Sequence, residues 1–158
     1  MIPLAPLFIQ MKESLEQLLE VLSRERTALA TATADDILQL ASEKKSLLDA
    51  IDTANEKRTK MLVKFGVLEA KNPTEYAFNE WLTKQPAMED VKELVAQCNI
   101  LLDQCKQENY TNARILTTLQ KRNKTMLETL QGHSRKNKVY TATGNTRPVS
   151  SKHTLGRA

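Results

Sequence analysis

The chain has few of the residues that build turns, disulfide frameworks or aromatic cores. Its 158 residues include four glycines, five prolines and two cysteines, and 4% of them are aromatic. This composition is typical of helical proteins and argues against a sandwich of short strands joined by glycine- and proline-rich turns. No run of about 18 apolar residues is present to span a membrane. The apolar start of the chain lacks the basic region of a signal peptide. We therefore expect a cytoplasmic, all-α protein.

Sequence patterns of catalysis and of metal or cofactor binding are also missing. The chain has no nucleophile elbow, no glycine-rich phosphate loop and no metal-spaced cluster of histidines and cysteines. Two adjacent carboxylate pairs, Asp35–Asp36 and Glu89–Asp90, stand at expected helix starts, where capping explains them. We expect no enzymatic activity, no cofactor and no metal site.

The two cysteines are predicted to be core residues. Cys98 and Cys105 are seven residues apart, which puts them on one helix face at a separation of about 10 Å. A disulfide needs Cα atoms about 4.4–6.8 Å apart, so these two cannot pair within a helix. Small, reduced thiols packed in a core are the simpler interpretation.

Charge is distributed unevenly along the chain. The net charge is +4, yet residues 131–158 contain six Lys or Arg and no Asp or Glu, so the rest is slightly acidic. The same segment holds three of the four glycines. Such a composition cannot bury enough apolar area to fold, and we expect residues 132–158 to form a flexible basic tail. Binding of nucleic acid by this tail is an alternative, but no recognition motif accompanies the charges.

Apolar residues at intervals of three and four predict two amphipathic helices, over about 4–32 and 36–66. Asp35 or Asp36 is expected to cap the second helix, and Gly66 to end it. If the chain folds back between Ala34 and Asp35, the apolar positions of the two stripes face each other, from Leu29 opposite Leu40 to Leu4 opposite Phe65. The polar positions also match, with Glu25 opposite Lys44. This symmetry favours an antiparallel hairpin over a single helix of about sixty residues.

A connecting segment follows the hairpin. Residues 73–84 are predicted to form a short helix, with Asn72 as its cap and Pro73 at its first position. Trp81 lies in this helix. We interpret it as a hydrophobic plug that docks the helix on the bundle, with ligand stacking as the less favoured alternative.

A third long helix is expected over 87–131, ending before Gly132. At 1.5 Å per residue it is about 65 Å long, whereas each hairpin helix reaches about 45 Å. If the three helices pack up-down-up into an elongated bundle, about fifteen residues at the end of the third have nothing of their own chain to cover them. An apolar stripe left uncovered in this way usually marks a partner site.

Two short patterns then carry a resemblance. The segment CKQENYTNARIL places Asn109 and Asn112 on the inner stripe of the long helix, and Tyr140 is followed by Gly144 four residues later. Together with LEQLLEVLSRERTAL and LASEKKSLLDAI, these patterns resemble the FlgN-type family of flagellar export chaperones. The similarity covers nearly the whole chain. Thr141 and Thr143 depart from the small or acidic residues that the family more often has before the glycine.

The resemblance implies a non-enzymatic cytoplasmic chaperone. Members of the family bind hook–filament junction proteins through their C-terminal helical segments, prevent premature association and deliver them to the flagellar type III export gate. Tyr140 and Gly144 match the residues in the C-terminal tail through which family members dock on the gate. The residues expected to bind the client on the long helix are Asn109, Asn112, Ile115, Leu116, Leu119, Met126, Leu127 and Leu130.

A structural helical subunit or adaptor that forms homo-oligomers through the same stripe remains the competing interpretation. It differs from the chaperone in oligomeric state, because we expect the chaperone to be a monomer or a weak homodimer when alone.

Overall fold

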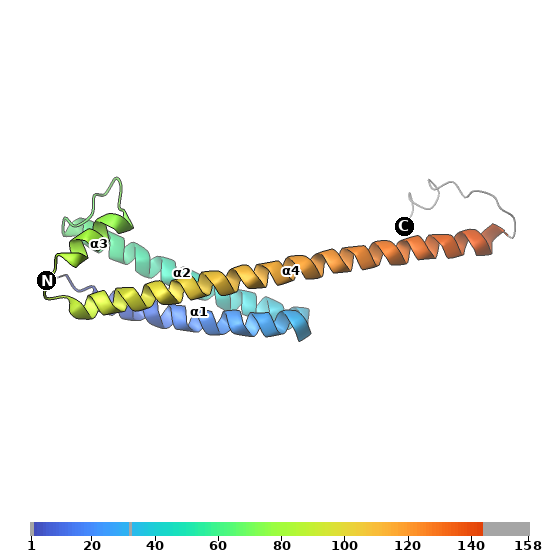
Figure 1. Ribbon diagram of the computed structural model, residues 1–158, viewed down its shortest axis with the longest axis horizontal. Coiled ribbons are helices and arrows are strands. Elements are labelled where there is room, and N and C mark those ends of the chain that lie inside the picture. The colour runs from blue at the N-terminus through green and yellow to red at the C-terminus, as the bar shows by residue number, and fades with distance from the viewer. Residues whose placement is uncertain (1, 32, 144–158) are drawn as a thin grey trace. The chain divides into compact units, whose positions relative to one another are not determined.

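The computed structural model describes residues 2–31 and 33–143, with side chains as far as Gly132. Within this range the protein is all-helical, as predicted, with four helices and no strand. The helices are α1 (Ala5–Thr31), α2 (Ala34–Lys64), α3 (Glu75–Thr83) and α4 (Glu89–Thr143) (Figure 1). The chain divides into two compact units, Met1–Ala113 and Arg114–Ala158, and α4 contributes to both.

The first two helices form the predicted antiparallel hairpin. Lys44 Nζ lies 3.4 Å from Glu25 Oε1, which confirms the register inferred from the two stripes. Arg24 and Glu43 form a neighbouring ion pair at 2.9 Å. The pairing expected at the far end is wrong, because Leu4 is fully buried whereas Phe65 is 52% exposed. Since α2 ends at Lys64, Phe65 is its C-cap and leaves the helical stripe, and Leu62 takes the buried place.

Threonines, and not the predicted acids or amide, cap two of the helices. The Thr33 side chain accepts a hydrogen bond from the Asp36 amide and begins α2, while Asp35 and Asp36 lie in the first turn. Thr74 caps α3 by accepting from Ala77 N at 3.2 Å, so the predicted Asn72 cap is wrong. Gly66 follows the end of α2 with a φ of 74°, as the helix end predicted there requires.

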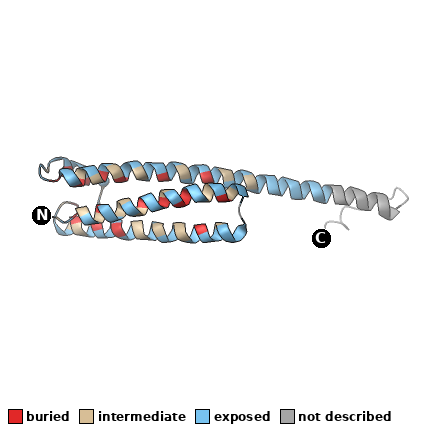
Figure 2. Ribbon diagram, turned by 90° about the horizontal axis from the view of Figure 1, so that it is seen from below, coloured by how far each residue is buried: buried red, intermediate tan, exposed pale blue. Residues whose placement is uncertain are grey.

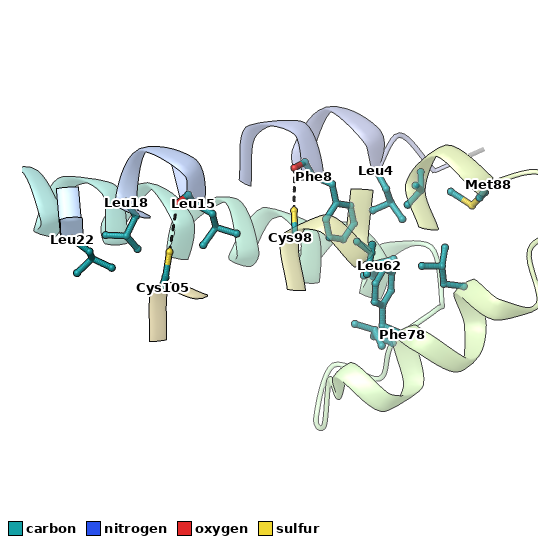
Figure 3. Packing of buried hydrophobic residues seen from close by; sticks show 14 residues of the cluster. Leu4, Phe8, Leu15, Leu18, Leu22, Leu62, Phe78, Met88, Cys98 and Cys105 are labelled. Atoms are coloured by element: carbon teal, nitrogen blue, oxygen red, sulfur yellow. Dashed lines mark hydrogen bonds between the residues drawn. The ribbon is translucent and has the colours of Figure 1, made fainter. Parts of the chain in front are cut away.

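The first part of α4 packs parallel to α1 through a ladder of side-chain hydrogen bonds. The Sγ atoms of Cys98 and Cys105 donate to the carbonyls of Phe8 and Leu15, each at 3.5 Å (Figure 3). Seven residues further along both helices, Asn112 Nδ2 donates to the carbonyl of Leu22 at 2.8 Å. Because thiols are small, α4 can approach the α1 backbone closely at these positions. Both cysteines are free and buried, as predicted.

The larger of two apolar clusters runs between α1, α2, α3 and the first part of α4, and a smaller one around Val21, Ala28 and Leu40 joins α1 to α2. The residues coloured as buried lie on the faces that these helices turn toward one another (Figure 2). Phe78 of α3 is fully buried beside Leu62 (Figure 3), and its ring stacks on Phe8 at a centroid distance of 5.9 Å. Trp81 stacks on Phe78 at 6.2 Å and packs against the cluster, which confirms it as part of the plug.

The C-terminal end predicted for the long helix is wrong. Gly132 is helical and α4 continues to Thr143, so residues 132–143 are not an irregular tail. A glycine inside a helix costs only about 1 kcal/mol relative to alanine, and no proline occurs before Pro148 in this part of the chain. Residues 144–158, and with them the prediction that the basic tail is flexible, lie outside the described residues.

Candidate partner-binding surfaces

The two asparagines of the N-x-x-N pattern are used inside the bundle. Asn112 is only 2% exposed. Besides its bond to the Leu22 carbonyl, its Nδ2 donates to Glu25 Oε1 at 2.9 Å, and its Oδ1 accepts from Arg26 Nε at 3.4 Å. Asn109 is exposed, but its Oδ1 accepts a hydrogen bond from Lys44 Nζ. Both amides therefore join α4 to the hairpin, and we do not assign them to a partner surface.

These contacts form one polar network across three helices. The Glu25 carboxylate is 16% exposed and receives both Lys44 and Asn112, so a cation and an amide satisfy its half-buried charge. Arg26 also pairs with Glu108 of α4. The network fixes the register of α1, α2 and α4 relative to one another at one level of the bundle. Apolar contacts alone would allow the helices to slide along one another more easily.

Burial raises the pKa of both thiols above the ordinary value of 9.0. For Cys98, desolvation is the largest cause, and a nearby Lys12 opposes it. For Cys105, the Glu108 carboxylate adds to desolvation. Both groups are therefore neutral thiols at pH 7, which is the form that can donate to a carbonyl.

The remaining predicted client residues lie along α4 beyond Ala113. At about 100° per residue they fall within an arc of about 120° on the helix. Charged residues occupy the opposite face, among them Lys121, Lys124 and Glu128. Four of the apolar side chains are exposed by 43–62%, and Ile115 and Leu119 are half-buried; the exposed four are Leu116, Met126, Leu127 and Leu130.

Tyr140 lies in the last helical turns of α4, and its side chain is outside the described part of the structure. Gly144 lies outside the described residues altogether. The docking role predicted for these two residues thus stays a prediction.

A second candidate surface was not predicted from the sequence. In the first unit, a groove of about 330 Å³ lies between α2 and α4, with α1 as its floor. Phe8, Met11 and Leu15 form the floor, and Ile51 and Leu102 contribute to the two walls. Sealed and empty, a cavity of this volume would cost roughly 8 kcal/mol at about 24 cal/mol per Å³, which is comparable to the stability of a whole domain. The groove is therefore either wet or filled.

Polar groups surround this apolar groove. Asn55, Asn79 and Asn99 contribute amides from three different helices, and Asp52 contributes a carboxylate that forms no ion pair among the described residues. Apolar walls with a few convergent polar groups are typical of binding sites. No local pattern could reveal this site, because its residues come from four separate helices and their positions follow from how the helices pack.

An ion pair closes the end of the groove nearest α3. Arg58 of α2, with a side chain 7% exposed, pairs with Glu75 of α3. Its guanidinium also lies over the rings of Phe8 and Phe78, at 5.8 and 5.1 Å. Its Nε has no hydrogen-bond partner among the described residues. The ion pair and the two rings attach α3 firmly to the bundle.

Comparison with known proteins identifies a family. The family model described as FlgN protein matches residues 4–148. No curated protein and no solved structure matches the chain at a significant level. No helix in the described part of the chain is long and apolar enough to cross a membrane. The same residues contain no cluster of three metal-ligating side chains.

Proposed function

The chain belongs to the FlgN family of flagellar export chaperones, and from this premise we propose that it binds hook–filament junction subunits before their export. In this proposal the chaperone covers amphipathic C-terminal helical segments of the subunits. The covered subunits cannot associate prematurely and are delivered to the flagellar type III export gate in the cytoplasm.

The observation that carries the proposal is the apolar stripe on the second half of α4. Met126, Leu127 and Leu130 are each about 60% exposed, although soluble proteins rarely leave large aliphatic side chains grouped in this way. A stripe with anchors three, four and seven residues apart matches the contact pattern of an amphipathic helix. The client surface that we propose runs from Ile115 to Leu130 and excludes Asn109 and Asn112.

Replacing one leucine of the stripe by an acid tests this surface. We expect Leu127→Asp to abolish detectable binding of the junction subunit, because a carboxylate buried without a partner costs several kcal/mol. Binding is measured by isothermal titration calorimetry, and folding by circular dichroism and thermal melting. Since Leu127 is 59% exposed, the melting temperature of the free protein should not change.

Thr125→Asp provides the matched control, because Thr125 lies on the face of α4 opposite the stripe. This variant should bind as the wild type does. If Leu127→Asp lowered the melting temperature together with binding, Leu127 would be a core residue and the proposed client surface would be wrong.

A further inference from the structure

The groove between α2 and α4 lies where a three-helix bundle would be expected to close. At one level, Lys44 of α2 and Asn109 of α4 are hydrogen-bonded. Nearer the start of α4, the short helix α3 covers the bundle and inserts Phe78 against Phe8. Between these two points, Met11 of the floor and Ile51 of α2 are only half-buried and Leu102 of α4 is 37% exposed, although Leu15 in the floor is buried. Thus α3 fills the position of a fourth helix beside α1, α2 and α4 only at the end of the bundle where α4 begins.

The dimensions of the open part indicate its occupant. Its floor extends from Phe8 to Leu15, and its α4 wall from Val95 to Leu102. Seven residues of helix correspond to about 10 Å, or two turns. A volume of about 330 Å³ is room for a few apolar side chains and not for a whole helix, whose outer face would remain in water.

The rim indicates the charge of the occupant. Asp52 has no cationic partner among the described residues, and Glu75, although paired with Arg58, is 65% exposed on the same rim. The one cation among the described residues that line the groove, Arg58, is buried and already paired. The surroundings therefore favour a basic residue next to the apolar anchors.

We propose that this groove binds two turns of an amphipathic helix of the junction subunit, and that this helix completes a four-helix arrangement with α1, α2 and α4. Its apolar side chains pack on Met11, Ile51 and Leu102, and a lysine or arginine at the edge of its apolar face pairs with Asp52. The inference rests on the proposed function, but it assigns the client a second contact in a different unit of the chaperone from the stripe on α4.

Filling the groove tests the proposal. Asn99 is exposed at the rim, so Asn99→Phe should fold normally and place a ring over the floor. We expect this variant to bind the full-length junction subunits of the same bacterium about tenfold more weakly or worse, measured by calorimetry. Its melting temperature should stay the same or rise, because the ring covers exposed apolar surface. The control is Gln104→Phe, which exchanges another amide for the same ring at an exposed position of α4 outside the groove.

Charge reversal provides an independent test. Asp52→Lys should weaken binding, whereas Asp49→Lys, one turn earlier on α2 and not part of the groove, should change it much less. The difference between the two variants should shrink as salt is added, because the pair with Asp52 lies at an exposed rim.

The outcomes separate this inference from the proposed function. If the wild type binds the subunit and Asn99→Phe binds as tightly as Gln104→Phe, the groove is not a client site, while the chaperone function stands. If the wild type binds no junction subunit, both proposals are wrong. Weaker binding by Asn99→Phe with an unchanged melting temperature supports the groove, since a purely structural role would not separate the two measurements.

Discussion

At the scale of single residues, Asn112 shows how one buried amide can organise three helices. It has partners on α1 through Leu22, Glu25 and Arg26, and Glu25 in turn binds Lys44 of α2. A buried amide of this kind stabilises the fold chiefly because its loss leaves other buried groups unpaired.

We therefore expect Asn112→Ala to lower the free energy of unfolding by about 2–4 kcal/mol, measured by urea denaturation. Asn109→Ala, which removes one exposed hydrogen bond, should cost about 1 kcal/mol or less. Similar losses in the two variants would contradict the central role that we give to Asn112.

The two buried thiols predict a pH dependence of stability. Their pKa values are raised in the folded protein, so the unfolded chain releases the thiol protons at lower pH. Stability from the neutral thiols is fully present below the ordinary pKa of 9.0 and is lost as the pH rises through the folded values. Urea denaturation between pH 7 and 11 should show this decrease. A variant with both cysteines replaced by alanine should lose that part of the pH dependence.

At the scale of helices, the sequence predicts the hairpin well because its signal is periodic. Two stripes that are mirror images about residues 34 and 35 leave only one register, and the Glu25–Lys44 contact confirms it. Helix ends were harder to predict, since Thr33 and Asp36, or Asn72 and Thr74, are equally plausible caps, and only the backbone conformation decides between them. The groove could not be predicted from the sequence, because it depends on how four helices pack together.

The helix end predicted before Gly132 is the largest error in the predicted helices, because α4 continues to Thr143. A substitution at Gly132 tests whether the helix is continuous there. A Cβ added at Gly132 meets no atom within 4 Å, and its φ is not positive. Gly132→Ala should therefore stabilise this part of α4 by about 0.5–1 kcal/mol. Hydrogen exchange of the backbone amides around residue 132 would measure the gain as slower exchange. Faster exchange in the variant would mean that the helix is interrupted at Gly132.

At the scale of the whole molecule, the proposed chaperone must bind the client and the export gate separately. We expect Tyr140→Ala to leave binding of the junction subunit unchanged and to weaken binding to the gate about ten- to a hundred-fold, since one aromatic ring contributes roughly 1.5–3 kcal/mol when buried. A variant that lacks residues 145–158 is the comparison. If only this deletion weakens gate binding, and the effect fades with salt, the basic residues bind the gate and Tyr140 does not.

Oligomeric state separates the chaperone from the structural alternative. Light scattering should find a monomer or a weak homodimer that forms a defined complex with the junction subunit. A stable homo-oligomer that ignores the subunit would instead support a structural role for the stripe on α4.

The ladder between α1 and α4 has one more consequence, for the way in which the chain reaches its native state. Donors and carbonyls both repeat every seven residues, so an α4 docked one heptad out of step would bring Cys98 to the carbonyl of Leu15 and Cys105 to that of Leu22. Among the three donors of the ladder, only Asn112 distinguishes the two arrangements, because the shift places it beside Leu29, away from Glu25 and Arg26. A misregistered intermediate would keep its sulfur–carbonyl bonds but bury an amide that lacks two of its native partners. Such an intermediate would be short-lived, because the unpaired Asn112 amide destabilises the shifted alignment of the two helices.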